Sequence, residues 1–274
     1  MKTNVCTKIF LLCCMGMVVA CSSSRVNVAE TTAKDNLMEE ASNPVAAVSS
    51  SETNVVDTTT KDSLFVEETR TIEDFHEIFI VAPAKISFYQ KEGAPSLTIT
   101  GKRDLVDIVR TDTENGVLKI YPVKDFNGSV NVELSAPSVE KITIAGVGTV
   151  TMENSFVLGN LDVSIFGIGA VIIRRGLVCD NFTINHAGAG SLYIRNVSCN
   201  HLWVDVSRFG YVNVRGECRT ADLRMSGSGL IDVSQLEGRI NTELIGGGSI
   251  TTSEGTITKT EGFSVEGLKD TVTE

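Results

Sequence analysis

The sequence predicts an all-β protein folded as a parallel β-helix, a solenoid with coils of about 19–21 residues. Glycines recur in steps of 21, 21, 20, 19 and 19 residues, at Gly148, Gly169, Gly190, Gly210, Gly229 and Gly248. Apolar residues alternate around each of them, as in strands. No helical period of 3.6 residues intervenes, which argues against strand–helix repeats. A fixed period of strand-type units is typical of a solenoid.

Residues 1–20 are predicted to be a lipoprotein signal peptide. Lys2 and Lys8 accompany an apolar stretch, residues 9–20, that is too short to span a bilayer. The sequence Val-Val-Ala-Cys ending at Cys21 resembles a bacterial lipobox, in which the cysteine carries fatty acyl chains after cleavage. An ordinary secretory signal cut nearby is the alternative. Several acyl chains anchor a protein stably, so Cys21 is the predicted lipidation site and membrane tether.

Residues 21–70 are predicted to be the lipidated cysteine followed by a flexible acidic stalk. Serine, threonine, alanine, valine and acids dominate, with hardly an aromatic residue. Such a segment cannot bury enough apolar surface to offset its ordering entropy. The net charge of −10 for the whole chain argues against nucleic acid as a partner.

Residues 71–140 are predicted to be a strand-rich N-terminal cap with the first coils. Alternating segments are separated by turns at Asn115-Gly116 and Asn127-Gly128. The open core of a solenoid must be covered at its end, which this region can do. Residues 256–274 are predicted to be a polar C-terminal tail that caps the other end or frays.

Residues 141–255 are predicted to be the regular coils. Two positions before each recurring glycine stands another glycine, and Arg208 alone breaks this column. We expect the paired glycines to mark a corner where a side chain would collide with the opposite wall or the backbone needs positive φ. A phosphate-binding loop would need a following helix, and none follows.

With these strands and Gly-x-Gly coils, such as MSGSGLIDV at 225–233, residues 72–255 resemble the putative auto-transporter adhesin, head GIN domain family. The resemblance implies a right-handed β-helix and a bacterial envelope lipoprotein of the kind common in Bacteroidetes. It implies no catalytic residues and no established activity. The middle coils depart from the usual small polar corners, because Phe166, Ile168 and Phe209 stand there.

Those departures are the best functional clue in the sequence. By strand parity, six apolar or aromatic side chains face outward, and neighbouring coils should gather several of them into an exposed patch: Phe166, Ile168, Tyr193, Trp203, Phe209 and Tyr211. Large exposed apolar patches mark partner or ligand surfaces. Cover by the chain itself or by a second copy is one interpretation; an envelope protein or a glycan, whose sugar faces suit aromatic rings, is the other.

Arg174, Arg195 and Arg215 lie five residues after their glycines and form a second column. Like charges about 5 Å apart repel, so anions could sit between them, with Glu153 and Asp180 as internal partners. A solvated basic stripe and a site for an acidic glycan are the two interpretations.

Two further features have structural explanations. Cys179, Cys199 and Cys218 stand at nearly matching places, and we expect buried free thiols there, although a disulfide is open in an exported protein. His186 occupies an apolar column, as expected of a core histidine. No metal site and no cofactor are predicted.

The alternative function is a carbohydrate-active enzyme, a polysaccharide lyase or hydrolase, on the same scaffold. Such chemistry needs convergent carboxylates. Asp162 and Asp222 share a column but stand three coils apart, and Asp205 and Asp232 lie in other columns. We therefore expect a membrane-tethered, non-catalytic binding or structural module of the bacterial envelope. An outer-membrane lipoprotein is expected, with the periplasmic face favoured because the residues after Cys21 lack an acidic run.

Overall fold

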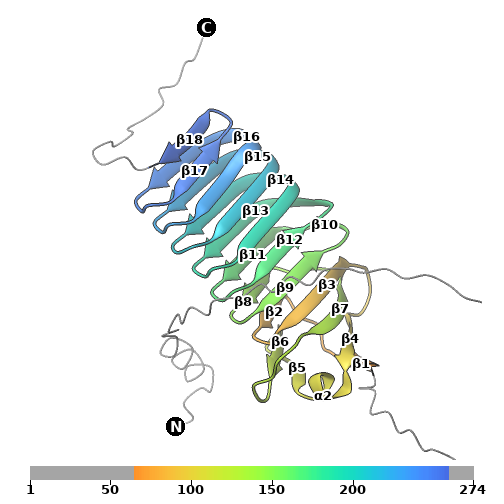
Figure 1. Ribbon diagram of the computed structural model, residues 1–274. Coiled ribbons are helices and arrows are strands. Elements are labelled where there is room, and N and C mark those ends of the chain that lie inside the picture. Colours follow the sequence, from red (N-terminus) through yellow and green to blue (C-terminus); the bar gives the residue numbers. More distant parts are fainter. Residues whose placement is uncertain (1–64, 259–274) are drawn as a thin grey trace, which may run out of the picture. The chain divides into compact units, whose positions relative to one another are not determined.

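The structure, a computed structural model, describes residues 65–258 (Figure 1). The predicted signal peptide, Cys21, the stalk as far as residue 64 and tail residues 259–274 lie outside the described residues. No helix among the described residues is long and apolar enough to cross a membrane.

The chain folds as a β-solenoid of about five turns with parallel, stacked coils, which confirms the predicted fold class. In Figure 1 the long strands lie side by side, each coil on the one before. The parallel ladders link strands from successive coils: β8 (Lys141–Ile144), β9 (Gly148–Met152), β10 (Ser155–Val157), β11 (Asn160–Ile165), β12 (Ala170–Ile173), β13 (Gly176–His186), β14 (Ser191–Val206), β15 (Tyr211–Met225) and β16 (Leu230–Leu244).

Each coil has three sides, which the pattern of burial in β14 reveals. Residues 192 and 194 point inward, then 197 and 199, then 202, 204 and 206. Two pairs of non-buried residues, 195–196 and 200–201, interrupt the alternation and mark bends. We call the segments before, between and after these bends the first, second and third sides; a four-residue corner, such as 207–210, leads from the third side to the first side of the next coil.

Paired glycines at the corners allow the backbones of successive coils to approach closely. A Cβ atom on Gly167 would collide with the carbonyl oxygen of Gly146, and one on Gly188 with that of Gly167. Neither glycine has a positive φ angle. The obstacle is therefore the backbone of the preceding coil, not the opposite wall or an unusual dihedral angle as the sequence led us to expect.

The first coil consists of β2 (Glu77–Ile80) and β3 (Ala84–Gln90), on which β8 and β9 stack. On their other edge lie β6 (Val117–Pro122) and β7 (Val130–Ala136), also parallel. The stack thus begins with β6 and β7, although they follow β2 and β3 in the chain.

Antiparallel elements complete this end. The strand β4 (Ser96–Lys102) pairs with both β1 (Phe65–Arg70) and β7, and β5 (Val109–Glu114) pairs with β6. A four-residue helix, α2 (Arg103–Val106), follows β4. At the other end, β17 (Ser249–Thr252) extends the first side and forms an antiparallel hairpin with β18 (Gly255–Thr258).

Inward-facing apolar columns fill the solenoid. Ile165, Val206 and Met225 are fully buried in one such column, and Val171, Leu192 and Val212 in another. Full burial of one such side chain stabilises a fold by roughly 1.5–3 kcal/mol. The regular core therefore supports an outer surface whose side chains are free to serve other purposes.

Candidate binding surface

Exposed apolar side chains from successive coils line one corner. Val147, Ile168, Ala189 and Phe209 occupy the same place in four successive corners. The corners of the first three are joined by hydrogen bonds from the Ile168 N–H to the Gly146 carbonyl (3.0 Å) and from the Ala189 N–H to the Gly167 carbonyl (3.1 Å). We call these four residues the corner ridge. Val147 is 55%, Ile168 54% and Phe209 72% exposed.

A shallow groove of about 500 Å³ lies against the corner ridge. Val147, Ile168 and Ala189 line it together with Pro83 and Ala84 from the first coil. The remaining lining residues are mostly small: Lys85, Gly128, Ser129, Gly148, Thr149, Gly169, Ala170, Gly190 and Ser191. The groove offers an apolar floor with a single charged side chain, Lys85, at its side.

Two tyrosines extend this surface over the first side. The rings of Tyr193 and Tyr211 are in contact, with centroids 5.2 Å apart and planes tilted by 49°. Partial burial, with Asp232 and Tyr193 nearby, raises the pKa of Tyr211. The hydroxyl therefore stays protonated at neutral pH and can donate a hydrogen bond.

Five of the six residues of the predicted patch lie at the corner or on the adjoining first side. They are Phe166, Ile168, Tyr193, Phe209 and Tyr211. Trp203 does not join them, because it lies on the third side between Thr183 and Asp222 of the neighbouring coils. Sequence reasoning missed Val147, Ala189 and the contribution of Pro83, although Val147 and Ala189 precede their glycines just as Ile168 and Phe209 do.

The three predicted arginines lie at the bend between the first and second sides of successive coils, all exposed. The Nε atom of Arg174 is 3.5 Å from an oxygen of Glu153, the predicted partner. The Nε–H of Arg215 donates to Asn213 Oδ1 (3.2 Å). Arg195, in the middle, has no ion-pair partner among residues 65–258.

Two aspartates near this row of arginines each accept a hydrogen bond from an asparagine. Asp232 accepts a hydrogen bond from Asn213 Nδ2 (2.8 Å). Partial burial raises the pKa of Asp232, but hydrogen bonds from Ser234 and Asn213 and the nearby Arg215 outweigh it and leave the pKa below its ordinary value. Asp180, the other predicted partner, instead accepts a hydrogen bond from Asn200 (3.1 Å).

The cysteine column is internal. Cys179, Cys199 and Cys218 are paired in register across three coils, and all three are buried and free, as predicted. Burial, with Cys199 nearby, raises the pKa of Cys218 to about 11. A protonated, buried thiol is a poor nucleophile. No group of three or more His, Cys, Asp or Glu side chains within the described part of the chain could hold a metal ion.

His186 is a core residue, as predicted, with 1% of its surface exposed. Burial lowers its pKa, so the ring is neutral at pH 7. The Gly188 N–H donates to His186 Nδ1 (3.4 Å), whereas Nε2 has no hydrogen-bond partner among residues 65–258. The ring points into the interior and is not available to a ligand.

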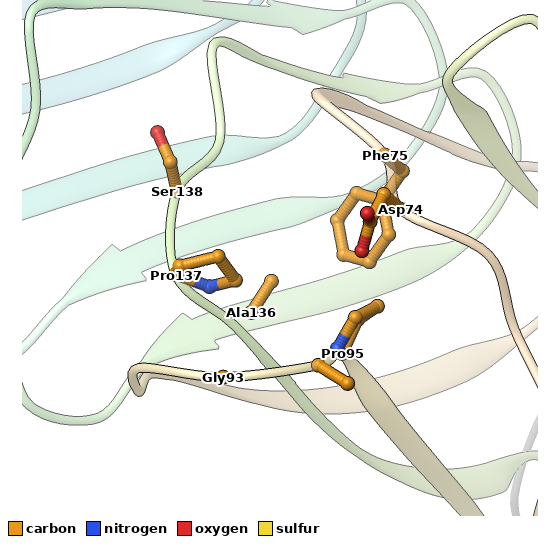
Figure 2. A pocket seen from close by; sticks show the side chains of 8 residues that line it. Asp74, Phe75, Gly93, Pro95, Ala136, Pro137 and Ser138 are labelled. Atoms are coloured by element: carbon orange, nitrogen blue, oxygen red, sulfur yellow. The ribbon is translucent and has the colours of Figure 1, made fainter.

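The carboxylates do not converge. Asp162 and Asp222 share a column on the third side, but Thr183 and Trp203 stand between them. A second hollow, of about 420 Å³, lies near the cap, and Figure 2 shows Phe75, Pro95 and Pro137 around it. Asp74 is the only ionisable residue among those that line it. The hollow offers Asp74 no base. In the column, Asp222 lies 3.5 Å from His201 Nε2, but no second carboxylate of the column stands beside this pair.

The family described as "Putative auto-transporter adhesin, head GIN domain" matches residues 74–254. A crystal structure of a "Putative lipid binding protein" from Parabacteroides distasonis is 21% identical, with a TM-score of 0.51, and the match covers 69% of this chain and 96% of that one. A "putative adhesin" from Bacteroides fragilis is 17% identical, with a TM-score of 0.54 and coverage of 67% and 95%. No curated protein matches the chain. At these identities the solved structures share its fold.

Proposed function

Because the chain belongs to the family of the putative auto-transporter adhesin, head GIN domain, we propose that it is a membrane-tethered, non-catalytic binding module of the bacterial cell envelope. Acyl chains on Cys21 hold it in the outer membrane, with the domain on the periplasmic side. The corner ridge, the groove beside it and the two tyrosines form its binding surface.

The exposure of the corner ridge is the observation that carries this proposal. The same place in the next two corners is taken by Ser228 and Gly247, so the fold does not require an apolar side chain there. Exposed apolar side chains in adjacent coils cost solubility and gain nothing for the core. A partner that covers them accounts for their presence.

The first candidate partner is a second copy of the chain. Ridge side chains follow one another at the strand spacing of about 4.8 Å. Two such ridges related by a twofold axis can interdigitate, because a twofold interface brings together identical surfaces. An envelope protein with a similar apolar edge is the second candidate, and the unpaired Arg195 would favour an anionic group beside it.

Sedimentation velocity on the unlipidated chain, begun at residue 22, tests the surface. We expect wild type to self-associate with rising concentration and the double variant Ile168→Ser/Phe209→Ser to stay monomeric. Serine fits these places because Ser228 already occupies one of them. Trp203→Ser removes an exposed aromatic outside the surface and should behave as wild type.

The same three proteins are then tested for binding to outer-membrane vesicles from cells that lack the protein. Binding by wild type and Trp203→Ser, but not by the double variant, supports an envelope partner instead of a second copy. A fluorescent fatty acid is a third probe, because the Parabacteroides distasonis relative is described as a lipid-binding protein. If wild type and the double variant are alike in all three measurements, the corner ridge is not a binding surface and the proposal fails.

A further inference from the structure

Positive charge gathers at one bend of a chain whose net charge is −10. Arg174, Arg195 and Arg215, which we call the arginine row, stand at the bend between the first and second sides of three successive coils. Arg175, next to Arg174, is exposed like the three arginines of the row and has no ion-pair partner among residues 65–258. Arginines of successive coils follow one another at the strand spacing of about 4.8 Å, at which like charges repel.

The acids of the chain balance this charge only in part. Glu153 and Asp232 lie at the two ends of the arginine row. Glu217, on the second side, accepts a hydrogen bond from Ser198 (3.1 Å). Arg195, in the middle of the row, has no ion-pair partner in the described part of the chain. The four arginines exceed the two acids at the ends by two positive charges, and this local excess favours an anionic ligand.

The first side beside the arginine row carries groups that suit a sugar ring. Tyr193 stands two residues before Arg195 on β14, is 42% exposed, and contacts the ring of Tyr211. Arg215 donates from Nε to Asn213 Oδ1 (3.2 Å), and Asn213 is the neighbour of Tyr193 in the next coil. This hydrogen bond holds the guanidinium close to the two rings. An aromatic ring can pack on the apolar face of a sugar, and a guanidinium binds a carboxylate through two parallel hydrogen bonds.

We propose that the arginine row and the adjoining first side bind an acidic polysaccharide, a chain of sugars that carry carboxylates, along the axis of the solenoid. The rise from one coil to the next is close to the length of one sugar unit in an extended chain, so successive arginines can each meet a carboxylate. Tyr193 packs against a sugar ring beside them. One carboxylate on one exposed arginine binds weakly, and the linkage of several in one chain supplies the affinity.

This inference rests on the proposed function, because it uses the two tyrosines of the proposed binding surface. It does not depend on the corner ridge. Ile168 of the ridge precedes the first side of its coil, whereas Arg174 follows that side, so the ridge and the arginine row lie at its opposite ends. A second copy on the ridge and a polysaccharide on the row are therefore separate events.

Isothermal titration calorimetry of the unlipidated chain, begun at residue 22, with oligomers of galacturonic acid tests the site. At physiological ionic strength we expect a hexamer to bind and the monomer to give no measurable binding. Arg195→Gln should weaken binding of the hexamer about fivefold, and Arg174→Gln/Arg195→Gln/Arg215→Gln about tenfold or more, because each exposed ion pair contributes modestly. Tyr193→Ser should weaken it as well. The altered side chains are exposed, so the fold should be retained.

Matched controls separate the site from general charge and from aromatic content. The triple variant Arg110→Gln/Arg219→Gln/Arg239→Gln removes the same charge from exposed places outside the arginine row and should bind the hexamer as wild type does, because salt screens distant exposed charges. Trp203→Ser, which removes an exposed aromatic side chain on the third side, is the control for Tyr193→Ser and should also match wild type.

Equal affinity of wild type and the arginine-row triple variant for the hexamer would overturn the inference. A six-unit polyphosphate that binds as tightly as the hexamer would overturn it too, since the row would then attract any anion without recognising sugars. A wild type that self-associates in sedimentation velocity but does not bind the hexamer would overturn this inference and leave the proposed function standing. Binding of the hexamer that depends on the row, without self-association, would support the inference and count against a second copy on the corner ridge.

Discussion

His186 stands in a column that otherwise holds only apolar side chains, with Ile165 below it and Val206 and Met225 above. Its Nδ1 atom accepts a hydrogen bond from Gly188, so Nε2 carries the proton and is buried without a partner in the described part of the chain. A buried, unsatisfied polar group costs about 1–3 kcal/mol. The residue therefore weakens the coil in which it lies, and more so when the ring is charged.

His186 should make the fold sensitive to mild acid. Burial lowers the pKa in the folded state, so the unfolded chain binds this proton at higher pH than the folded chain. Stability is thus fully present above the ordinary pKa of about 6.5 and falls below it by up to about 1.4 kcal/mol per pH unit. His186→Leu should be at least as stable as wild type near neutral pH and should lack this loss.

Urea unfolding of both proteins between the neutral range and mild acid measures the effect. Because the carboxylates are the same in both proteins, their contribution cancels in the difference between the two curves. Two curves that stay parallel would mean that His186 titrates alike in the folded and unfolded states.

At the scale of the element, the corners set how closely coils can stack. Gly190 is half-buried, and a Cβ atom there would collide with the carbonyl oxygen of Gly169 in the coil below. The nearest atom to a Cβ on Gly247, in contrast, is the hydroxyl oxygen of Ser228 at 3.8 Å. A side chain at Gly190 would therefore meet the backbone of the neighbouring coil, whereas one at Gly247 would make only an ordinary contact.

We expect Gly190→Ala to destabilise the domain by about 3 kcal/mol, the upper end of the usual range for overpacking, because backbone and not a flexible side chain would have to move. Gly247→Ala should stay within about 0.5 kcal/mol of wild type, as exposed substitutions generally do. The difference between the urea unfolding midpoints of the two variants measures how much stability is lost when the corners of two successive coils are pushed apart. Equal midpoints would show that the corner glycines are not needed for close stacking.

The glycine spacing was enough to predict the coils, the cysteine column and the core position of His186, since each needs only the register between coils. It was not enough for Trp203, because parity along a strand does not reveal the two bends that turn Trp203 away from Tyr193. It also could not place β6 and β7 beneath β2 and β3. Those strands carry no paired glycines, and their order in the stack depends on tertiary pairing.

At the scale of the whole molecule, the proposed function depends on where the proposed binding surface is held. Residues 22–64 separate Cys21 from β1, and a fully extended chain of that length reaches on the order of 150 Å. In the arrangement we propose, this length lets self-association through the corner ridge join copies anchored at separate points in one membrane. Attachment to one membrane would also raise the local concentration of these copies, so that even a weak interface could hold two of them together.

Cys21 should decide whether the protein stays in the membrane. In the producing bacterium, Cys21→Ser removes the proposed site of the acyl chains, and we expect the protein to move from the membrane fraction to the soluble envelope fraction. Cys14→Ser, within the predicted signal peptide, is the matched control and should leave the mature protein in the membrane, because the proposal places the acyl chains on Cys21 alone. Protease added to intact cells should spare wild type if the domain faces the periplasm, and degradation would place it at the cell surface.

If Cys21→Ser remained in the membrane fraction, acyl chains on Cys21 would not explain the attachment. The triple variant Cys21→Ser/Ile168→Ser/Phe209→Ser then tests whether the corner ridge holds the protein there: release would point to the ridge, and retention would point to a tether elsewhere in the chain.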